Sequence, residues 1–565
     1  MRVILIFLFS TCIIFLSFSI TTTWTGSSNV WWNTAGNWSN GVPTSSDDVI
    51  IPDVSGASGN FPKFTGTGSN INCRNLTINS GATLTLSSTN SKALYVYGDI
   101  VVNGTIDGTY ATLVLYSGTN GISGTPTDVS SVFLYARNGS TFTLNSNWSI
   151  NNLQTQDVGS TFNVASGVTL TTNFVYNRND CFLVLLGTGA LDVNSSCAVL
   201  PEARSTFTMN SGTLYCSTNL GANSSATFNA GTGTVVLDGS TSTEIRYAYT
   251  FYNLTINKDA TDDVVSCQDS DDDVTVSNNL TITEGTLSNI DADFTVSGNT
   301  TMDGGKFIAS SSNGPVTFTG NLTLNGSAII DHQGTTSAGD IDLSGDLDIN
   351  GTAGIQSSTD TDRRLDLLKT PGGNVYVEAT AAANSSTSNW IVRGQYTFND
   401  DITVGSFLTG YNQSSSVTVV TGKTLTITDD FYNQWGSSFT LSGTAGLTTN
   451  GSVTQLGIHT GSTFTLNSGT LDVNAGTLTV ASNAGATVNF NSGNINVAGD
   501  YQSGSGTINW STSTLSFDGS ANSVINDALS CYNLTIAKDA TDDIVSCVDA
   551  DADIAVSNNF TITEG

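Results

Sequence analysis

Basic residues are scarce in this chain, and their scarcity excludes one class of function. Lys and Arg together contribute 16 of the 565 residues, whereas Asp and Glu contribute 47, so the net charge is −31. A surface that binds nucleic acid needs clustered Lys and Arg to neutralise phosphates. We therefore expect no nucleic-acid partner.

Residues that favour helices are also few. Glu occurs only five times and Lys seven times, whereas coiled coils and helical bundles need both in bulk. Gly, Ser, Thr, Asn and Asp fill their place, and these are residues of turns. His occurs only twice, at His332 and His459, so there is no histidine metal cluster, and the sequence gives no basis for a Ser/His/Asp or Cys/His arrangement.

The N-terminus has the pattern of a targeting segment. Met1 and Arg2 precede an uncharged stretch that runs from Val3 to Ile20. This pattern predicts a cleaved secretory signal peptide over residues 1–20, and an uncleaved membrane anchor is the alternative. No other segment is apolar enough to cross a bilayer. We expect a secreted protein, extracellular or on the cell surface, that is not an integral membrane protein once the signal is cleaved.

Seven cysteines follow the signal peptide, and an odd number cannot all pair within one chain. Cys181/Cys197 and Cys531/Cys547 share a spacing of sixteen residues and are disulfide candidates in an oxidising compartment. The alternative is that Cys serves as a small core residue, because the counterpart of Cys531 in an internal repeat is Phe251.

Internal repeats dominate the rest of the chain. Residues 252–285 and 532–565 are identical at 26 of 34 positions, and weaker similarity extends this duplicated unit to 206–285 and 487–565. A shorter period lies within it. An Asn or Asp recurs before a short apolar alternation, with spacings of 20, 22 and 25 residues, at Asn279, Asn299, Asn321 and Asp346.

The apolar residues alternate with Thr, Asn or Ser, as in residues 76–78 and 464–466. This period of two predicts very short strands with one buried face, separated by corners rich in Gly, Asn and Asp. Stacked units of 20–25 residues with three strands each predict an all-β fold, a right-handed parallel β-helix over residues 71–565, and at about 22 residues per coil the roughly 540 mature residues would form about 24 coils. The variable coil length argues against evenly spaced rows of Thr.

Residues 21–70 differ in composition, because they hold four of the eight Trp residues. We expect this segment to be an N-terminal cap with the first strands, since an open solenoid end exposes core and backbone. The alternative is an aromatic platform that stacks on sugars.

A family resemblance rests on the repeated sequence motifs at residues 251–256 and 277–282 and on the Trp-rich segment at residues 24–52. The chain resembles the secreted parallel β-helix (β-solenoid) surface and adhesin-like proteins of bacteria and some archaea. The resemblance implies an extracellular stalk, adhesin or matrix protein, often part of a larger polypeptide. Because residues 563–565 stop in the middle of a unit, we expect the array to be truncated at its C-terminus.

The best candidate for a ligand site is a tract of alternating acidic residues that occurs in both copies of the duplicated unit. Alternate residues of an extended segment point the same way, and closely spaced carboxylates suit calcium. The calcium candidates are Asp269, Asp271, Asp273, Asp549, Asp551 and Asp553. The alternative is a solvated acidic corner without a metal, and no other cofactor is expected.

No enzyme motif is recognisable. Adjacent Asp pairs occur, but a glycosidase needs two carboxylates at a set distance, and Arg363-Arg364 is the only basic pair. We expect a non-enzymatic extracellular β-solenoid, structural or adhesin-like, that presents Thr, Asn and Asp ladders to cell-surface or extracellular polysaccharide. Lateral self-association is a further possible interaction. A polysaccharide lyase or glycoside hydrolase, and a phage-type spike or fibre, are the alternatives.

Overall fold

The structure is a computed structural model that describes most of the chain from residue 19 onward. Residues 1–18, which hold most of the predicted signal peptide, lie outside the described part. The other residues outside it are 58, 65–68, 87–92, 222, 224, 268–272, 290–292, 310–315, 333–340, 358–363, 368–374, 380–388, 411–413 and 549–552.

The described residues form an all-β fold in which short strands stack in parallel as a β-solenoid of about 19 coils. One 3-10 turn, η1 (Ala35–Asn37), is the single helical element within the described ranges. The chain divides into two compact units. The N-terminal unit comprises residues 1–213 and 223–229, and the C-terminal unit comprises residues 214–222 and 230–565.

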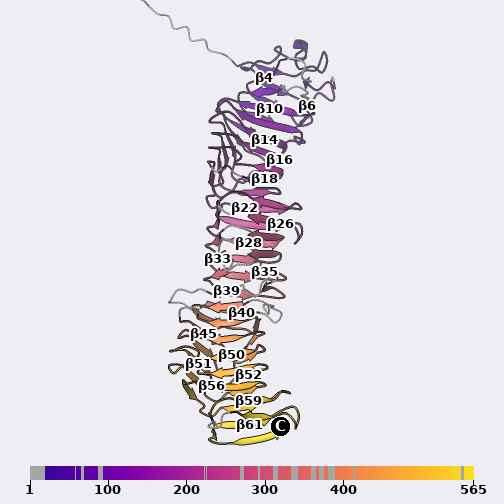
Figure 1. The fold of residues 1–565 in the computed structure, drawn as a ribbon. Coiled ribbons are helices and arrows are strands. Elements are labelled where there is room, and N and C mark those ends of the chain that lie inside the picture. The colour runs from indigo at the N-terminus through magenta and orange to yellow at the C-terminus, as the bar shows by residue number, and fades with distance from the viewer. Residues whose placement is uncertain are drawn as a thin grey trace, which may run out of the picture. The chain divides into compact units, whose positions relative to one another are not determined.

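Three parallel ladders build the N-terminal unit (Figure 1). The first contains β1 (Thr21–Thr23), β2 (Asp48–Ile51), β5 (Leu76–Ile78), β8 (Ile100–Val102), β11 (Thr119–Ser123), β13 (Thr141–Leu144), β15 (Thr161–Val164), β17 (Phe182–Leu185), β19 (Thr206–Thr208) and β21 (Thr227–Asn229). The second, called the main ladder here, contains β4 (Ile71–Cys73), β7 (Leu94–Val96), β10 (Ala111–Tyr116), β12 (Val132–Arg137), β14 (Trp148–Thr155), β16 (Thr169–Asn177) and β18 (Ala190–Ala198). The third contains β3 (Lys63–Phe64), β6 (Thr83–Leu86) and β9 (Thr105–Asp107).

The C-terminal unit contains two long ladders, and strand β20 (Thr213–Cys216) spans the division of the chain. One ladder contains β22 (Thr234–Gly239), β25 (Asn253–Lys258), β28 (Leu280–Glu284), β31 (Thr300–Met302), β34 (Leu322–Leu324), β37 (Leu347–Ile349), β40 (Val375–Ala379), β42 (Gln395–Phe398), β45 (Ser416–Val419), β48 (Ser438–Leu441), β51 (Thr463–Leu466), β54 (Thr487–Phe490) and β57 (Thr507–Asn509). The other contains β24 (Tyr249–Phe251), β27 (Val274–Val276), β30 (Phe294–Val296), β33 (Val316–Phe318), β36 (Ile341–Leu343), β39 (Arg364–Leu367), β41 (Asn389–Val392), β44 (Phe407–Thr409), β47 (Phe431–Asn433), β50 (Val453–Leu456), β53 (Thr477–Val480), β56 (Asp500–Ser503), β59 (Ser523–Ile525) and β62 (Val545–Cys547).

Shorter ladders complete the coils of this unit. One contains β23 (Thr243–Ile245), β26 (Val264–Cys267), β29 (Thr286–Asn289), β32 (Lys306–Ala309), β35 (Ile329–His332) and β38 (Gly354–Ser357). Another contains β43 (Ile402–Val404), β46 (Thr424–Ile427), β49 (Gly446–Thr449), β52 (Thr470–Val473), β55 (Asn494–Val497), β58 (Thr514–Phe517), β61 (Asn533–Ala537) and β64 (Phe560–Glu564). The last pairs β60 (Leu529–Cys531) with β63 (Ile554–Val556).

The predicted alternation sets which side of each strand is buried. On β51, Phe464 and Leu466 are fully buried, whereas Thr463 and Thr465 lie on the outer side. Inward rings then stack from coil to coil, because equivalent positions lie in register. The rings of Phe439 and Phe464 are parallel, with centroids 5.6 Å apart. Such contacts add to the burial of apolar area that stabilises each coil on the next.

The recurring Asn predicted from the sequence forms a hydrogen-bonded ladder. The side-chain Oδ1 of Asn279 accepts a bond from the backbone N–H of Asn299 at 3.1 Å, and Asn299 Oδ1 accepts one from Asn321 N–H at 3.0 Å. Asn321 Oδ1 accepts the next bond, from Asp346 N–H at 3.0 Å. Each corner therefore uses a side chain to satisfy a backbone donor of the following coil, which explains why Asn recurs although coil length varies.

Coil length varies more than the sequence indicated, and the predicted count of about 24 coils was too high. Register partners on neighbouring strands mark the length of one coil. The stretch of chain from Val235 to its partner Leu254 is much shorter than the stretch from Leu347 to its partner Val377. The additional residues lie between strands and add length without adding a coil. Strand register nevertheless places Thr418 beside Thr440 and Thr440 beside Thr465 on the outer side of three successive coils.

No disulfide joins any two of the seven cysteines after the signal peptide, so neither candidate pair is bridged. Six of them are buried, and only Cys547 is exposed. Cys267 is 1% exposed, and burial raises the pKa of its thiol to about 12. The buried cysteines therefore behave as small apolar core residues.

Candidate functional site

Aromatic side chains gather on the outer side of the main ladder in the N-terminal unit. On β12, Val132, Leu134 and Ala136 are buried, so the alternation directs Phe133 and Tyr135 outward. Strand β16 directs further rings outward in the same way. We call this surface the aromatic face, and it comprises Tyr95, Tyr97, Tyr116, Phe133, Tyr135, Phe174 and Tyr176.

Strand register places three of these tyrosines on alternate coils of one column. Tyr95 lies beside Val114, and Val114 lies beside Tyr135. The column continues from Tyr135 to Gln154 and from Gln154 to Tyr176. Val114 occupies an outward position but is only 2% exposed, which is expected for an aliphatic side chain between two large rings. The column therefore presents rings separated by smaller or polar residues.

A second column of outward side chains lies two positions earlier on the same strands and shows the same alternation. Phe133 lies beside Asn152, and Asn152 lies beside Phe174, which is 40% exposed. The pattern Phe-x-Tyr-x-Arg thus occurs on β12, where it ends at Arg137, and it recurs from Phe174 to Arg178. The side-chain Oδ1 of Asn152, which lies between the two Phe positions in the register, is buried without a hydrogen-bond partner.

Contacts between neighbouring rings fix the orientation of the face. Tyr116 packs edge-to-face against Tyr95 and Tyr97, with centroids 5.5 Å and 5.3 Å apart. Phe133 lies 5.5 Å from the ring of Tyr110, which is 59% exposed. Geometries of this kind contribute about 0.5–1.5 kcal/mol per pair beyond area burial. The rings are thereby held in place before any ligand arrives.

Charged groups around the face are balanced by one another. Arg137 pairs with Asp157, with 3.2 Å between Nε and Oδ2, and the Arg178 guanidinium lies 5.2 Å from the centroid of the Tyr176 ring. The hydroxyl of Tyr176 donates to Glu202 Oε1 at 3.0 Å. Burial and then this carboxylate raise the pKa of the Tyr176 phenol, so it stays a neutral donor at physiological pH.

The Trp-rich segment, the alternative platform for sugars, has little free ring surface. Trp24, Trp32 and Trp38 are each at most 5% exposed. They form edge-to-face pairs, with Trp38 4.9 Å from Trp24 and 4.7 Å from Trp32. Only Trp31, at 47% exposed, presents its ring to solvent in this segment. The buried three are therefore core residues and cannot stack on a ligand.

The calcium candidates fall largely outside the described part of the chain. Asp269, Asp271, Asp549 and Asp551 lie there, whereas Asp273 and Asp553 are described. The carboxylate of Asp273 contributes, after burial, to a raised pKa of Asp293. No group of three or more metal-ligating side chains occurs among the described residues. The calcium site stays a prediction.

The adjacent Asp pairs serve local structure. Asp48 binds Arg74 at 2.6 Å, which together with neighbouring hydrogen bonds holds its pKa below the usual range. Asp400 binds Lys423 at 2.6 Å, and Asp401 accepts a bond from the backbone N–H of Thr424 at 2.6 Å. These contacts join successive coils. Of the basic pair 363–364, the first residue and both side chains lie outside the described part.

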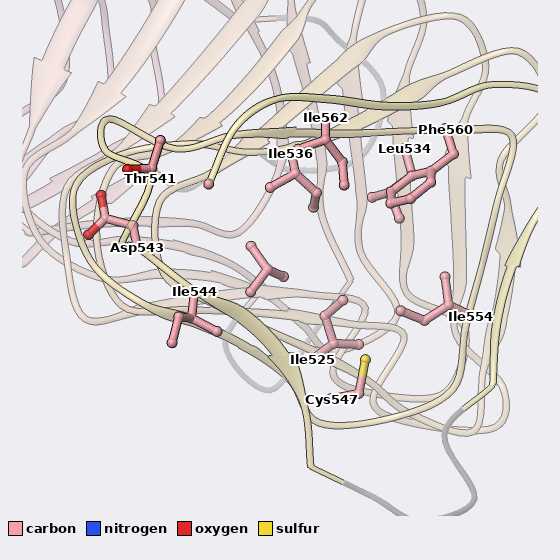
Figure 2. Close-up of a pocket in the computed structure, with 12 residues that line it drawn as sticks. Ile525, Leu534, Ile536, Thr541, Asp543, Ile544, Cys547, Ile554, Phe560 and Ile562 are labelled. Atoms are coloured by element: carbon pink, nitrogen blue, oxygen red, sulfur yellow. The ribbon is translucent and has the colours of Figure 1, made fainter.

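A cavity of about 420 Å³ opens on the last described coil of the C-terminal unit. Figure 2 shows that most of its wall is apolar, with Leu534 and Phe560 facing Ile525 and Ile554 across the opening, and that Thr541 and Asp543 line one side. Phe560 and Ile554 are 58% and 41% exposed. In the first copy of the duplicated unit, the counterpart of Phe560 is Leu280, which is fully buried under β31. The cavity is therefore lined by positions whose counterparts in the first copy pack under the following coil.

Comparison with known proteins gives one match. A family model described as "Domain of unknown function (DUF8693)" matches residues 23–112, which include the Trp cluster and the first tyrosines of the aromatic face. No curated protein and no solved structure matches the chain. Within the described residues, no helix has the length and apolar character needed to cross a membrane.

Sequence reasoning did not find the aromatic face. One usable signal was present, because six of the 16 Tyr residues lie between positions 95 and 176. The other was the repeated Phe-x-Tyr-x-Arg pattern. Neither identifies a surface until the register of the coils is known.

Proposed function

We propose that this chain is a non-enzymatic extracellular β-solenoid, adhesin-like in character, that holds polysaccharide on its aromatic face. The observation that supports the proposal is the outward placement of seven rings, six of them on strands of the main ladder and the seventh, Tyr97, directly after β7. Aromatic rings offer flat apolar area at a small cost in conformational entropy. The C–H faces of a pyranose ring pack on such a surface, while its hydroxyl groups bond to polar neighbours such as Gln154.

The rigidity of the face favours binding without rearrangement. Tyr116 is held between two other tyrosines, and Tyr176 is held by its hydrogen bond to Glu202. Groups that are ordered before binding lose little entropy when the ligand arrives. Several weak sugar contacts along a stack of coils then add, because they share one immobilised ligand.

A non-enzymatic role agrees with the state of the carboxylates. Cleavage of a glycosidic bond by the usual route needs two carboxyl groups on either side of it. Beside the aromatic face, Asp157 is paired with Arg137, and Glu202 accepts from Tyr176. Both carboxylates thus support neighbouring residues. A lyase or hydrolase is the alternative that the following experiment separates.

The test is incubation of the purified protein with soluble and insoluble polysaccharides, with and without calcium. Retention and released sugar ends are measured in the same tubes. We expect retention without release, and loss of retention in the Y135A and Y176A variants. Y247A is the matched control, because Tyr247 is 38% exposed and belongs to the C-terminal unit. Release of sugar ends would replace the proposal with an enzymatic one, and no retention at all would refute it.

Extracellular placement has its own test. The proposal requires removal of the predicted signal peptide over residues 1–20. Mass spectrometry of the protein secreted by its host should therefore find a mature N-terminus close to residue 21. Recovery of intact Met1 in a membrane fraction would favour the uncleaved anchor instead.

A further inference from the structure

We infer that the aromatic face selects a neutral, extended, β-1,4-linked polysaccharide that lies across successive coils, with every second sugar stacked on a ring. The inference rests on the proposed function and adds the class of ligand. It depends on two observations, the alternate-coil placement of the rings and the internal balance of the surrounding charges.

The alternation sets the period of the ligand. Tyr95, Tyr135 and Tyr176 occupy the first, third and fifth strands of the series β7, β10, β12, β14 and β16. Neighbouring strands lie 4.7–4.9 Å apart, so rings on alternate strands are separated by about 9.6 Å. In an extended β-1,4-linked chain, each sugar is turned over relative to the one before it. Equivalent faces therefore recur every second sugar, at a distance close to this ring separation.

The second column has the same period. Phe133 accompanies Tyr135, and Phe174 accompanies Tyr176, so each of these coils offers a pair of rings two positions apart. The coil between them, β14, offers Asn152 and Gln154 instead. A sugar that presents its edge and its hydroxyl groups at the intermediate position meets the Gln154 amide there, since the side-chain oxygen of Asn152 is buried. Two chemically equal subsites with a polar one between them match a ligand with a two-sugar repeat.

Charge argues for a neutral ligand. Two of the three guanidinium groups near the face are paired with carboxylates, Arg137 with Asp157 and Arg204 with Asp180 at 2.6 Å, and the third, Arg178, lies over the Tyr176 ring. The chain as a whole carries a charge of −31, and like charges within the Debye length of about 8 Å repel. A polyanion would be repelled by the net negative charge and would find two of these three guanidinium groups already paired with carboxylates. Neutral hydroxyl-bearing chains incur no such cost.

The first experiment is calorimetric titration with neutral β-1,4-linked oligosaccharides from the disaccharide to the hexasaccharide. We expect the affinity to rise at the trisaccharide, which reaches two rings of the column, and again at the pentasaccharide, which reaches three. Each step should be about two- to tenfold, as expected for one aromatic contact. Helical α-1,4-linked glucans and polyuronates of equal length should bind more weakly by at least one such step.

A rearranged variant tests the spacing itself. The double variant Y135Q/Q154Y keeps every ring but moves one of them to the neighbouring coil, so the alternation is lost. We expect about a two- to tenfold loss of pentasaccharide affinity relative to the wild type. Hydrogen exchange of β12 and β14 serves to confirm that the variant is folded.

The outcomes separate this inference from the proposed function. Binding of an α-linked or anionic polysaccharide that depends on Tyr135 and Tyr176 would overturn the inference and leave the proposed function intact. So would full affinity in the rearranged variant. Failure of every polysaccharide to bind would overturn both.

Discussion

Covering the last described coil should stabilise it by an amount that the structure allows us to estimate. Phe560, Ile562, Ile554 and Ile544 are 58%, 59%, 41% and 56% exposed at this face. Complete burial of a large apolar side chain contributes about 1.5–3 kcal/mol, so burying the exposed half of these four contributes about 3–6 kcal/mol. In the first copy, residues 286–309 provide this cover, since β28 pairs with β31 and β26 with β29.

The perturbation is to append the sequence of residues 286–309 directly after Gly565, the position equivalent to Gly285. The assay is hydrogen exchange of the amides in residues 529–564, because exchange reports local opening rather than global unfolding. At 1.4 kcal/mol per tenfold change, we expect exchange to slow by about two to four orders of magnitude.

A scrambled extension of the same composition is the control, and it should leave the exchange rates unchanged. Equal protection by both extensions would show that chain length alone is responsible. Absence of protection with the native extension would refute the argument that register and side-chain pattern suffice to add a coil.

Three further predictions concern stability. N321A removes the acceptor for the Asp346 backbone N–H and should lower the free energy of unfolding by about 1 kcal/mol, as measured by thermal melting, whereas N321D should retain the bond. Burial lowers the pKa of Lys538 in the folded protein, so the unfolded chain binds the Lys538 proton more tightly. The free energy of unfolding should therefore rise as the pH increases from the lowered pKa of the folded state towards the ordinary pKa of Lys. The K538M variant should lose this rise. Calcium should raise the melting temperature, and replacing the Asp residues of 269–273 by Asn should abolish that shift; no shift in the intact protein would exclude the site.

The sequence contained enough information for the parallel solenoid because the rules involved are local. Strand geometry places every second side chain on the same face, and Phe464 and Leu466 lie on the buried face of β51 as this rule requires. The recurring Asn marked a corner whose purpose the structure explains, as Asn299 shows by accepting from Asn321 N–H. Neither inference required knowledge of which coil lies beside which.

The aromatic face could not be predicted because it depends on register between coils of unequal length. The stretch of chain from Tyr95 to Tyr135 is nearly as long as the stretch from Tyr135 to Tyr176. That each stretch makes two coils depends on the length of every coil within it, and the sequence alone does not give these lengths. Val114 stands in the apolar run Leu113 to Leu115 and is indistinguishable from a core residue by sequence. It is an outward residue buried beside aromatic rings.

Comparison of outward positions indicates that the fold itself does not require these rings. On β51 of the C-terminal unit, the outward residues are Thr463 and Thr465, and the strand pairs in register with both neighbours. On β12 the same alternation carries Phe133 and Tyr135. Because the inward residues fill the core in both cases, the half-buried rings on β12 are not needed to form the core, although the contact of Phe133 with Tyr110 adds some stability. Exposed apolar patches are a liability for a soluble protein unless a ligand covers them. The proposed binding would account for the rings of the N-terminal unit, and it predicts that replacing them by Thr at positions 133 and 135 abolishes polysaccharide retention while lowering the melting temperature only by the loss of ring contacts such as that between Phe133 and Tyr110.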